Sequence, residues 1–319
     1  MLCVCLLTTG IAVRGQDIHF SQIDLNPVLF NPAYAGFFEG TARFGLAYRN
    51  QWAKVSKPYQ TFAATAEASV YRNRYHYNGI NVGLLAYRDR AGSLDYGSTA
   101  ANLIVSYYQS PTASNDQYLS FSVEAGYGQA GFDATGAELL DPKETFEKDH
   151  CTYLTIGAGA AWFYQPNENI IARAAISARN INRPNISYMG LDSSRLSTKW
   201  NLYGRTEWRF HPALAVVPIV ALQLQRKYHE IYYGSDIKWY LRESTDHIVA
   251  FAGFMMRHAD AAIFTLGAEY NAFAFAVSYD SNLSKLAVAS QSFGALELGL
   301  VYRLVPIKKR IGALPCPIM

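Results

Sequence analysis

The sequence lacks any apolar run long enough to cross a bilayer as a helix, for which about 20 residues are needed. Its longest uncharged apolar stretch runs from Leu2 to Val13. A stretch of about 12 residues suits the core of a signal peptide. The small residues Val13 and Gly15 predict cleavage before Gln16, so residues 1–15 are expected to be a signal peptide, although one without the usual basic start. The alternative is a buried N-terminal strand.

Charge is also scarce. Only 17% of the residues are charged and the formal net charge is +3, an excess too small to argue for a nucleic-acid partner. Cysteine is equally rare. Cys3 and Cys5 fall in the expected signal peptide, which leaves Cys151 and Cys316 without CxxC or CxxxH spacing near them. We therefore expect no zinc site and no cofactor.

Sequence signatures of catalysis are missing as well. There is no GxSxG, HExxH, P-loop or deaminase signature, and the seven histidines are scattered. Gly157 and Gly159 are not followed by a helical pattern, so we expect them to relieve crowding at a strand wall rather than to bind a dinucleotide. A barrel enzyme would need a serine, a histidine and an acid gathered at one rim, and nothing points to such a set. An enzyme is therefore not expected.

Aromatic residues, in contrast, are abundant: the chain has 17 Phe, 23 Tyr and 5 Trp. Such a load suits the girdles of a membrane barrel, where aromatic rings lie at the level of the lipid headgroups. Between residues 200 and 210, apolar side chains alternate with polar and charged ones, and successive side chains of a strand point to opposite faces. We expect lipid to be faced by Trp200, Trp208 and Phe210, and the lumen by Arg205, Glu207 and Arg209.

The same alternation returns along almost the whole chain, in segments of about the length of a tilted membrane strand, roughly 9 to 11 residues. One such strand alone would more often belong to a soluble sandwich, and it is the repetition of the pattern that favours a membrane barrel. The expected strands cover residues 41–50, 59–71, 78–88, 97–109, 117–132, 150–165, 169–180, 197–210, 214–226, 229–241, 246–256, 261–271, 273–281 and 292–304. We predict an all-β fold: a transmembrane antiparallel up-and-down β-barrel of about 14 strands over residues 41–305, followed by a periplasmic tail, 306–319.

Connection lengths favour the same fold. Loops after even strands are short, whereas loops after odd strands include the longest ones, 133–149, 181–197 and 282–291. Bacterial outer-membrane barrels have an even number of strands, short periplasmic turns and longer extracellular loops. We therefore expect a bacterial outer-membrane protein with these loops outside and both termini in the periplasm.

Charged residues are expected on the inner face of the barrel. Their signs alternate between strands, which predicts a ladder of interior ion pairs. They are Arg43, Arg49, Glu67, Glu124, Arg173, Arg179, Glu269, Glu297 and Arg303. Many other inward positions carry Gly, Ala or Ser, which leaves room for water or for a plug.

Residues 16–40 differ from the rest, since they show no sustained period and contain two Asn-Pro steps. Proline removes a backbone donor and restricts the residue before it. We expect an extended N-terminal segment that folds against the barrel or into its lumen. In this segment, Phe20, Asn31 and Tyr34 are the candidates for obstructing the pore.

A series of short motifs occurs in order along almost the whole mature chain. They are His19-Phe20-Ser21-Gln22, Asn31-Pro32-Ala33-Tyr34-Ala35-Gly36, Tyr48-Arg49-Asn50-Gln51-Trp52, Pro58-Tyr59-Gln60-Thr61, Asp89-Arg90-Ala91-Gly92, the stretches 179–188, 278–284 and 294–302, and Cys316-Pro317. Each motif alone is weak, but the ordered series resembles the PorP/SprF family, outer-membrane proteins associated with type IX secretion and gliding. The end of the chain, Ile318-Met319, departs from the basic or aromatic close of that family.

The resemblance implies a barrel without catalytic activity that works with other components of the type IX secretion or gliding machinery. Family members engage the C-terminal domains of secreted, adhesin-like proteins and support their secretion or their anchoring at the cell surface. The alternative function is a general porin or small-solute channel, which mixed lumenal charge and small inward residues would allow.

Long loops on a rigid barrel are where binding usually resides. The 181–197 loop mixes charge, a rigid proline and an aromatic ring, and the 282–291 loop is apolar, which suits a protein interface. We expect this side to dock the C-terminal domain of the secreted partner, while the wall contacts outer-membrane lipid. The candidate partner-binding residues are Arg183, Asn185, Tyr188, Leu283 and Leu286. The alternative is that these loops pack only on each other as a lid.

The two cysteines of the mature chain are expected at opposite ends of the barrel, Cys151 at the extracellular rim and Cys316 in the periplasmic tail. The bilayer core between them is about 30 Å thick. A disulfide needs Cα atoms within roughly 7 Å of each other. We predict no bond between them.

Overall fold

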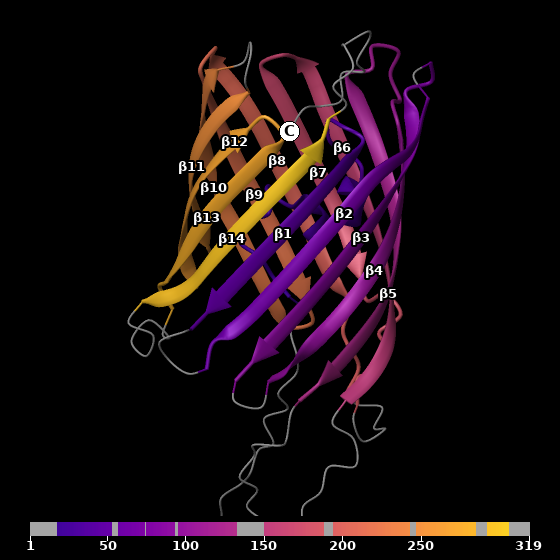
Figure 1. Cartoon of the computed structure of the whole chain (residues 1–319), viewed down its shortest axis with the longest axis vertical. Helices are drawn as coiled ribbons and strands as arrows, with labels where there is room; N and C mark the ends of the chain where they lie inside the picture. The colour runs from indigo at the N-terminus through magenta and orange to yellow at the C-terminus, as the bar shows by residue number, and fades with distance from the viewer. Residues whose placement is uncertain are drawn as a thin grey trace, which may run out of the picture.

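The computed structural model describes residues 18–52, 57–73, 75–92, 95–132, 150–187, 194–242, 247–284 and 292–305. Within these ranges, fourteen antiparallel strands close into one barrel (Figure 1). Each strand pairs with its neighbours in sequence, and β1 closes on β14, from Ala42 opposite Leu304 to Gln51 opposite Ala295. The predicted up-and-down barrel is confirmed.

The strands have these bounds: β1 Ala42–Gln51, β2 Tyr59–Asn73, β3 Asn78–Ala91, β4 Tyr96–Gln109, β5 Gln117–Gly131, β6 His150–Asn167, β7 Ile170–Arg179, β8 Lys199–His211, β9 Leu214–Gln225, β10 Tyr228–Arg242, β11 Ile248–Arg257, β12 Ala261–Tyr270, β13 Phe273–Asn282 and β14 Phe293–Leu304. Each predicted boundary lies within three residues of the observed one. The boundaries could be predicted this closely because the alternation of apolar and polar side chains continues to the rim of the barrel and stops where the turn residues begin.

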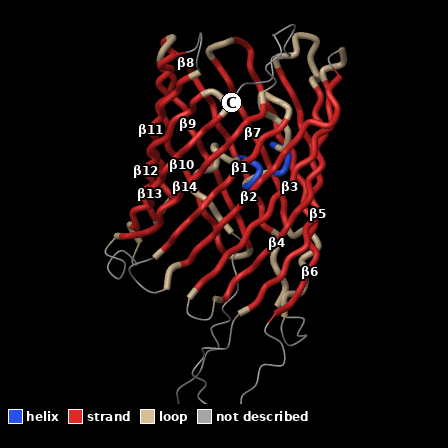
Figure 2. Tube along the Cα trace, viewed as in Figure 1, coloured by secondary structure: helices blue, strands red, loops and turns tan. Residues whose placement is uncertain are grey.

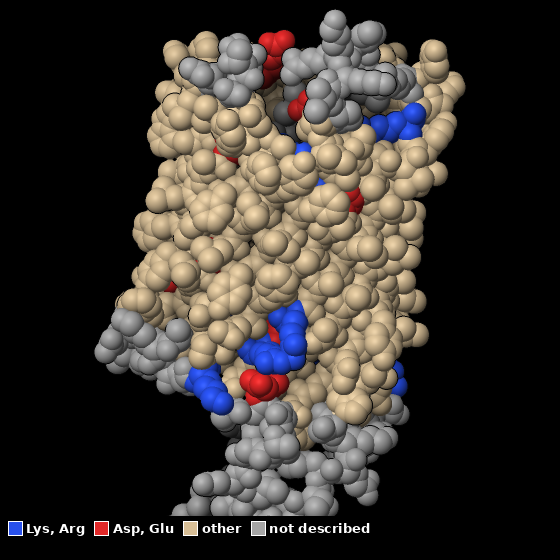
Figure 3. Space-filling view, viewed as in Figure 1, with Lys and Arg blue, Asp and Glu red and all other residues tan. Residues whose placement is uncertain are grey.

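Many large apolar side chains are exposed on the outer face of the wall, and the face drawn in Figure 3 shows few charged atoms between the rims. In β8, Trp200, Trp208 and Phe210 are exposed on this face, as predicted. Arg205 and Glu207 are buried inside. Arg209 is half-buried, with its guanidinium 3.7 Å from the centre of the Tyr240 ring. The predicted register of this strand is therefore confirmed.

The two rims of the barrel differ, as the connection lengths predicted. Odd strands end and even strands begin at one rim, which we name the long-loop rim; it is at the bottom of Figure 1. Odd strands begin and even strands end at the opposite, short-turn rim. There β12 and β13 are joined by a turn of two residues, and β8 and β9 are joined by another two-residue turn.

Residues 18–40 lie inside the barrel rather than on its outside, and we name them the lumenal segment. Two short 3-10 helices, η1 (Pro27–Leu29) and η2 (Pro32–Tyr34), interrupt this segment (Figure 2). Each begins at one of the Asn-Pro steps, because proline has the backbone angle of a first helical position and no donor to lose there. At η2 the Asn31 side chain also accepts a hydrogen bond from the Ala33 N–H, at 2.8 Å.

Cys151 is free and half-buried at the start of β6, on the long-loop rim. Cys316 lies outside the described residues, so the absence of a bond between them stays a prediction. No helix in the described part of the chain is long and apolar enough to cross a membrane.

Candidate functional site

The lumenal segment is anchored near the long-loop rim by a buried cluster of ion pairs. Arg49 on β1 pairs with Glu297 on β14 and, at 3.0 Å, with Asp280 on β13. The Ser21 backbone N–H donates to Glu297 Oε1 at 2.8 Å, and the Ser21 hydroxyl donates to Asp280 Oδ2 at 3.0 Å. Charged acceptors give the stronger hydrogen bonds, so Ser21 is held firmly to two strands at once.

Three residues further on, an acidic side chain of the segment meets the opposite wall. Asp24 forms an ion pair with Arg205 on β8 at 2.8 Å and accepts a hydrogen bond from the Tyr203 hydroxyl. Arg205 also forms an ion pair with Glu207 on the same strand, at 2.8 Å, so Asp24 is linked to the charges of the wall.

Small polar side chains of the wall satisfy the backbone of the segment. Ser177, Ser120 and Ser106 donate to the carbonyls of Phe30, Ala33 and Ala35, at 3.2, 2.7 and 2.8 Å. Because the carbonyls of so short a helix find few partners within it, these serines replace the water that would otherwise be needed.

The same segment is fixed to β2 through a shared carboxylate. Glu67 accepts a hydrogen bond from the Gly36 N–H at 3.0 Å. Its two carboxylate oxygens also accept hydrogen bonds from the guanidinium of Arg43, at 2.8 and 2.9 Å. Here one of the predicted lumenal ion pairs serves as an anchor for the segment.

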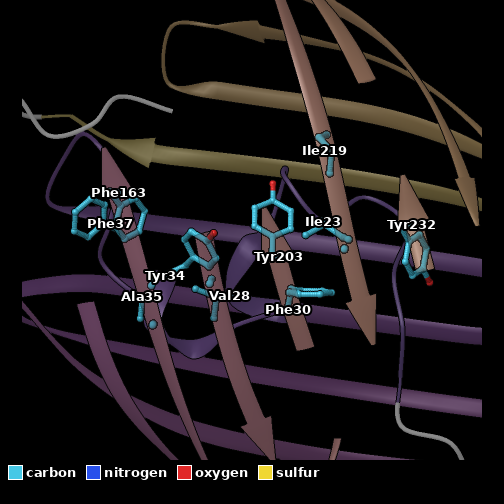
Figure 4. Packing of buried hydrophobic residues seen from close by; sticks show 14 of the residues in the cluster. Ile23, Val28, Phe30, Tyr34, Ala35, Phe37, Phe163, Tyr203, Ile219 and Tyr232 are labelled. Atoms are coloured by element: carbon cyan, nitrogen blue, oxygen red, sulfur yellow. The ribbon is translucent and has the colours of Figure 1, made fainter. Parts of the chain in front are cut away.

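Aromatic packing fills the space between these polar contacts (Figure 4). Phe37 stacks on Phe163 of β6, with ring centroids 3.6 Å apart. Tyr34 meets Phe163 and Tyr203 edge-on, at 5.4 and 6.0 Å, and Phe30 also packs on Tyr203. The interior of this barrel is therefore a hydrophobic core at one level and a set of ion pairs at others.

Glycines in the wall leave the room that the segment needs. A Cβ at Gly159 would lie 2.3 Å from Asn31 Oδ1, and a Cβ at Gly299 would lie 2.2 Å from Leu25 Cδ2. The sequence predicted that Gly159 relieves crowding at the wall, and the close neighbour is the lumenal segment.

The predicted ladder of interior ion pairs is confirmed. The described pairs include Arg43 with Glu67, Arg49 with Glu297, Arg179 with Glu124, and Arg303 with Glu269. Lys238 joins Glu207 to Glu269, at 3.3 and 3.5 Å, and so extends the Arg205 pair along the wall.

Among the described residues, the interior of the barrel includes two cavities that bear on the site. One of about 80 Å³ lies beside residues 22–25 among the charges of the ladder. The other, of about 640 Å³, lies at the long-loop rim, and we name it the vestibule. Its floor is Ile18 and His19, and its wall includes Tyr59, Tyr87 and Tyr228.

The structure brings the three candidate pore-obstructing residues into the interior. Phe20, Asn31 and Tyr34 are 7, 0 and 1% exposed, and each lies in the lumenal segment. Obstruction of permeation by these residues stays a prediction. The sequence did not identify Ser21 and Asp24 as anchors, because the segment that carries them shows no periodic pattern.

The candidate partner-binding residues are only partly described. Arg183 is exposed and adopts a left-handed backbone angle, φ 47°. Asn185 pairs with Arg195 in an isolated bridge, which folds the loop back on itself and places Ile186 and Leu196 at the vestibule. Leu283 is 57% exposed at the end of β13. Tyr188 and Leu286 lie outside the described residues.

No group of three or more metal-ligating side chains occurs among the residues that the structure describes. The features that stand out are a closed wall with an apolar outer surface, an ion-paired interior and an internal segment. Together they define the class of protein: an outer-membrane β-barrel.

The model of the type IX secretion system membrane protein PorP/SprF family matches residues 12–302. The chain belongs to this family, as the ordered motifs predicted. No curated protein matches the chain.

Among solved structures, the toluene transporter TbuX of Ralstonia pickettii is similar, with a TM-score of 0.51 and 13% identity over 88% of this chain and 94% of that one. CymD, a monoaromatic hydrocarbon channel, has a TM-score of 0.50 and 11% identity over 90 and 94%. Identities this low show a shared fold and carry no information on what this chain binds.

Proposed function

We propose that the protein is a non-enzymatic barrel of the type IX secretion or gliding machinery, which engages the C-terminal domain of a secreted, adhesin-like protein and supports its secretion or surface anchoring. Family membership over residues 12–302 is the observation that carries this proposal. Other components of the same machinery are expected partners.

We place the docking face on the long-loop rim and the extracellular side. Arg183 and Leu283 are exposed there, and the vestibule lies between the strand ends that carry them. A charge and an apolar side chain around a tyrosine-lined hollow suit a protein interface. Tyr188 and Leu286 remain proposed members of this face.

We further propose that the lumenal segment, including Phe20, Asn31 and Tyr34, obstructs the pore. Contacts of the segment with β1, β2, β8, β13 and β14 support this role. A general porin, the alternative function, would require the segment to leave these anchors.

The docking role is tested by replacing residues 183–188 with a Gly-Ser turn. The matched control replaces residues 111–115, in the turn between β4 and β5 on the other rim, in the same way. Both variants should assemble as barrels, which heat-modified migration on a gel would report. Only the 183–188 variant should release the surface protein into the medium. Normal surface retention in that variant would place the docking face elsewhere.

A further inference from the structure

The lumenal segment has a direction that its sequence does not reveal. Its end at Gly40 and Thr41 lies at the short-turn rim, where the Thr41 N–H donates to the Leu304 carbonyl at 2.9 Å. Just before it, the Phe38 carbonyl lies 3.5 Å from the Arg72 guanidinium, near the end of β2 on the same rim.

The beginning of the segment lies at the opposite rim. Lys199, the first residue of β8, donates from Nζ to the Ile18 carbonyl at 2.6 Å. Ile18 and His19 line the vestibule together with Tyr228, the first residue of β10. Both strands begin at the long-loop rim.

The contacts between these ends follow one another across the lumen. Ser21 is held by β13 and β14 near the long-loop rim. Asp24 then meets Arg205 on β8, and Gly36 meets Glu67 on β2, near the short-turn rim. The segment therefore crosses the whole barrel before β1 begins.

We infer that the lumenal segment is threaded from the outside inward, so that Ile18 and His19 form a floor of the vestibule that is reachable from the cell exterior. This rests on the proposed function in one respect, the placement of the long-loop rim outside. The direction of the thread itself does not depend on it. A partner that enters the vestibule would touch the beginning of the same segment that fills the lumen.

This direction departs from the expectation that both termini are periplasmic. That expectation followed from the even strand count, which fixes where β1 begins and β14 ends, namely at one rim. It does not fix the segment before β1. The described chain has Ile18 at one rim and Val305, the residue after β14, at the other.

Three single cysteines, introduced in a Cys151→Ser, Cys316→Ser background, test the inference. Ile18→Cys probes the vestibule floor. Tyr228→Cys, at a site 58% exposed, marks the long-loop rim, and Tyr75→Cys, at a site 93% exposed in the turn before β3, marks the short-turn rim. The probe is a maleimide on a polyethylene glycol chain too large to pass through porins, applied to intact cells and to cells with a permeabilised outer membrane.

We expect Ile18→Cys and Tyr228→Cys to react on intact cells, and Tyr75→Cys to react only after permeabilisation. Reaction of Ile18→Cys only together with Tyr75→Cys would overturn the inference while leaving the proposed orientation intact. If Tyr75→Cys reacts on intact cells and Tyr228→Cys does not, the orientation is inverted and presentation to the exterior is excluded.

His19→Cys serves as a second floor variant if Ile18→Cys does not assemble. An assembled floor variant that reacts only after unfolding would show that the floor is closed, which also contradicts the inference.

Discussion

At the scale of single residues, the wall and the lumenal segment are fitted to each other. Gly159 on β6 leaves space for Asn31, whose carboxamide oxygen caps η2 through the Ala33 N–H. The Asn31 amide also donates to the Ala160 carbonyl at 3.3 Å. Asn31 thus joins the segment to the strand only because its neighbour on the wall has no side chain.

Gly159→Ala should therefore destabilise the folded barrel by about 1–3 kcal/mol, the usual cost of overpacking. The unfolding temperature, followed by heat-modified migration, should fall. Gly204→Ala is the matched control, since its Cβ would meet only Val220 Cγ1, at 3.3 Å. Equal effects of the two substitutions would argue against close packing of the segment on β6.

A second prediction concerns Arg49, which is 2% exposed and pairs with two carboxylates. Arg49→Met leaves Asp280 and Glu297 buried with less compensation, and loss of one partner from a buried pair costs about 3–5 kcal/mol. The folded yield should drop sharply. Arg90→Met removes an exposed pair with Asp95 and should change little, because such pairs contribute about 0–1 kcal/mol. A similar yield for both variants would contradict this account of the cluster.

The sequence predicted these charges better than their partners. The alternation of side chains predicted Arg49 and Glu297 on the inner face. Because β1 and β14 are neighbours in the closed barrel, an ion pair between these two residues was expected. Ser21 and Asp24 could not be placed in the same way, because the segment that carries them has no period from which a face can be predicted.

At the scale of the strand, the alternation of outward and inward side chains decides what each position tolerates. Leu202 on β8 is exposed on the outer face. A charge on the lipid face is destabilising, by up to about 2–4 kcal/mol at mid-depth and by less toward the rims. Leu202→Arg should therefore reduce assembly in lipid vesicles. Leu283→Arg, in the long loop after β13, should assemble normally. Equal yields of the two variants would contradict the lipid-facing register of β8.

The neighbouring position shows what strand patterning alone misses. Tyr203 points inward, where the pattern predicts tolerance of charge, yet it is 5% exposed and packs on Phe30 and Tyr34. Tyr203→Arg should damage the core of the lumen. The pattern of the strand misses this effect because the lumen is filled by residues 18–40, which are far from Tyr203 in the sequence.

At the scale of the whole molecule, the fold was predictable and the path of the segment was not. Fourteen alternating stretches and the unequal connections determine a closed barrel with two unlike rims. The sequence predicts that the N-terminal segment, residues 16–40, folds against the barrel or into its lumen, and it does not distinguish between these two placements. The choice depends on the summed contacts of Ser21, Asp24, Tyr34 and Gly36 with strands far away in sequence.

Cys151 and Cys316 should remain unlinked, because a strand-length of barrel separates the start of β6 from the end of β14. Mass analysis of a non-reducing digest should show both cysteine peptides as separate species. A linked pair would contradict the predicted placement of the C-terminal tail in the periplasm.

The central claim is that the lumenal segment closes the barrel. Current across a planar bilayer that contains the purified protein tests it most directly. We expect no steady conductance from the wild-type chain and an open, steady conductance when residues 20–38 are deleted. Steady conductance from the wild-type chain would contradict the claim and favour a channel.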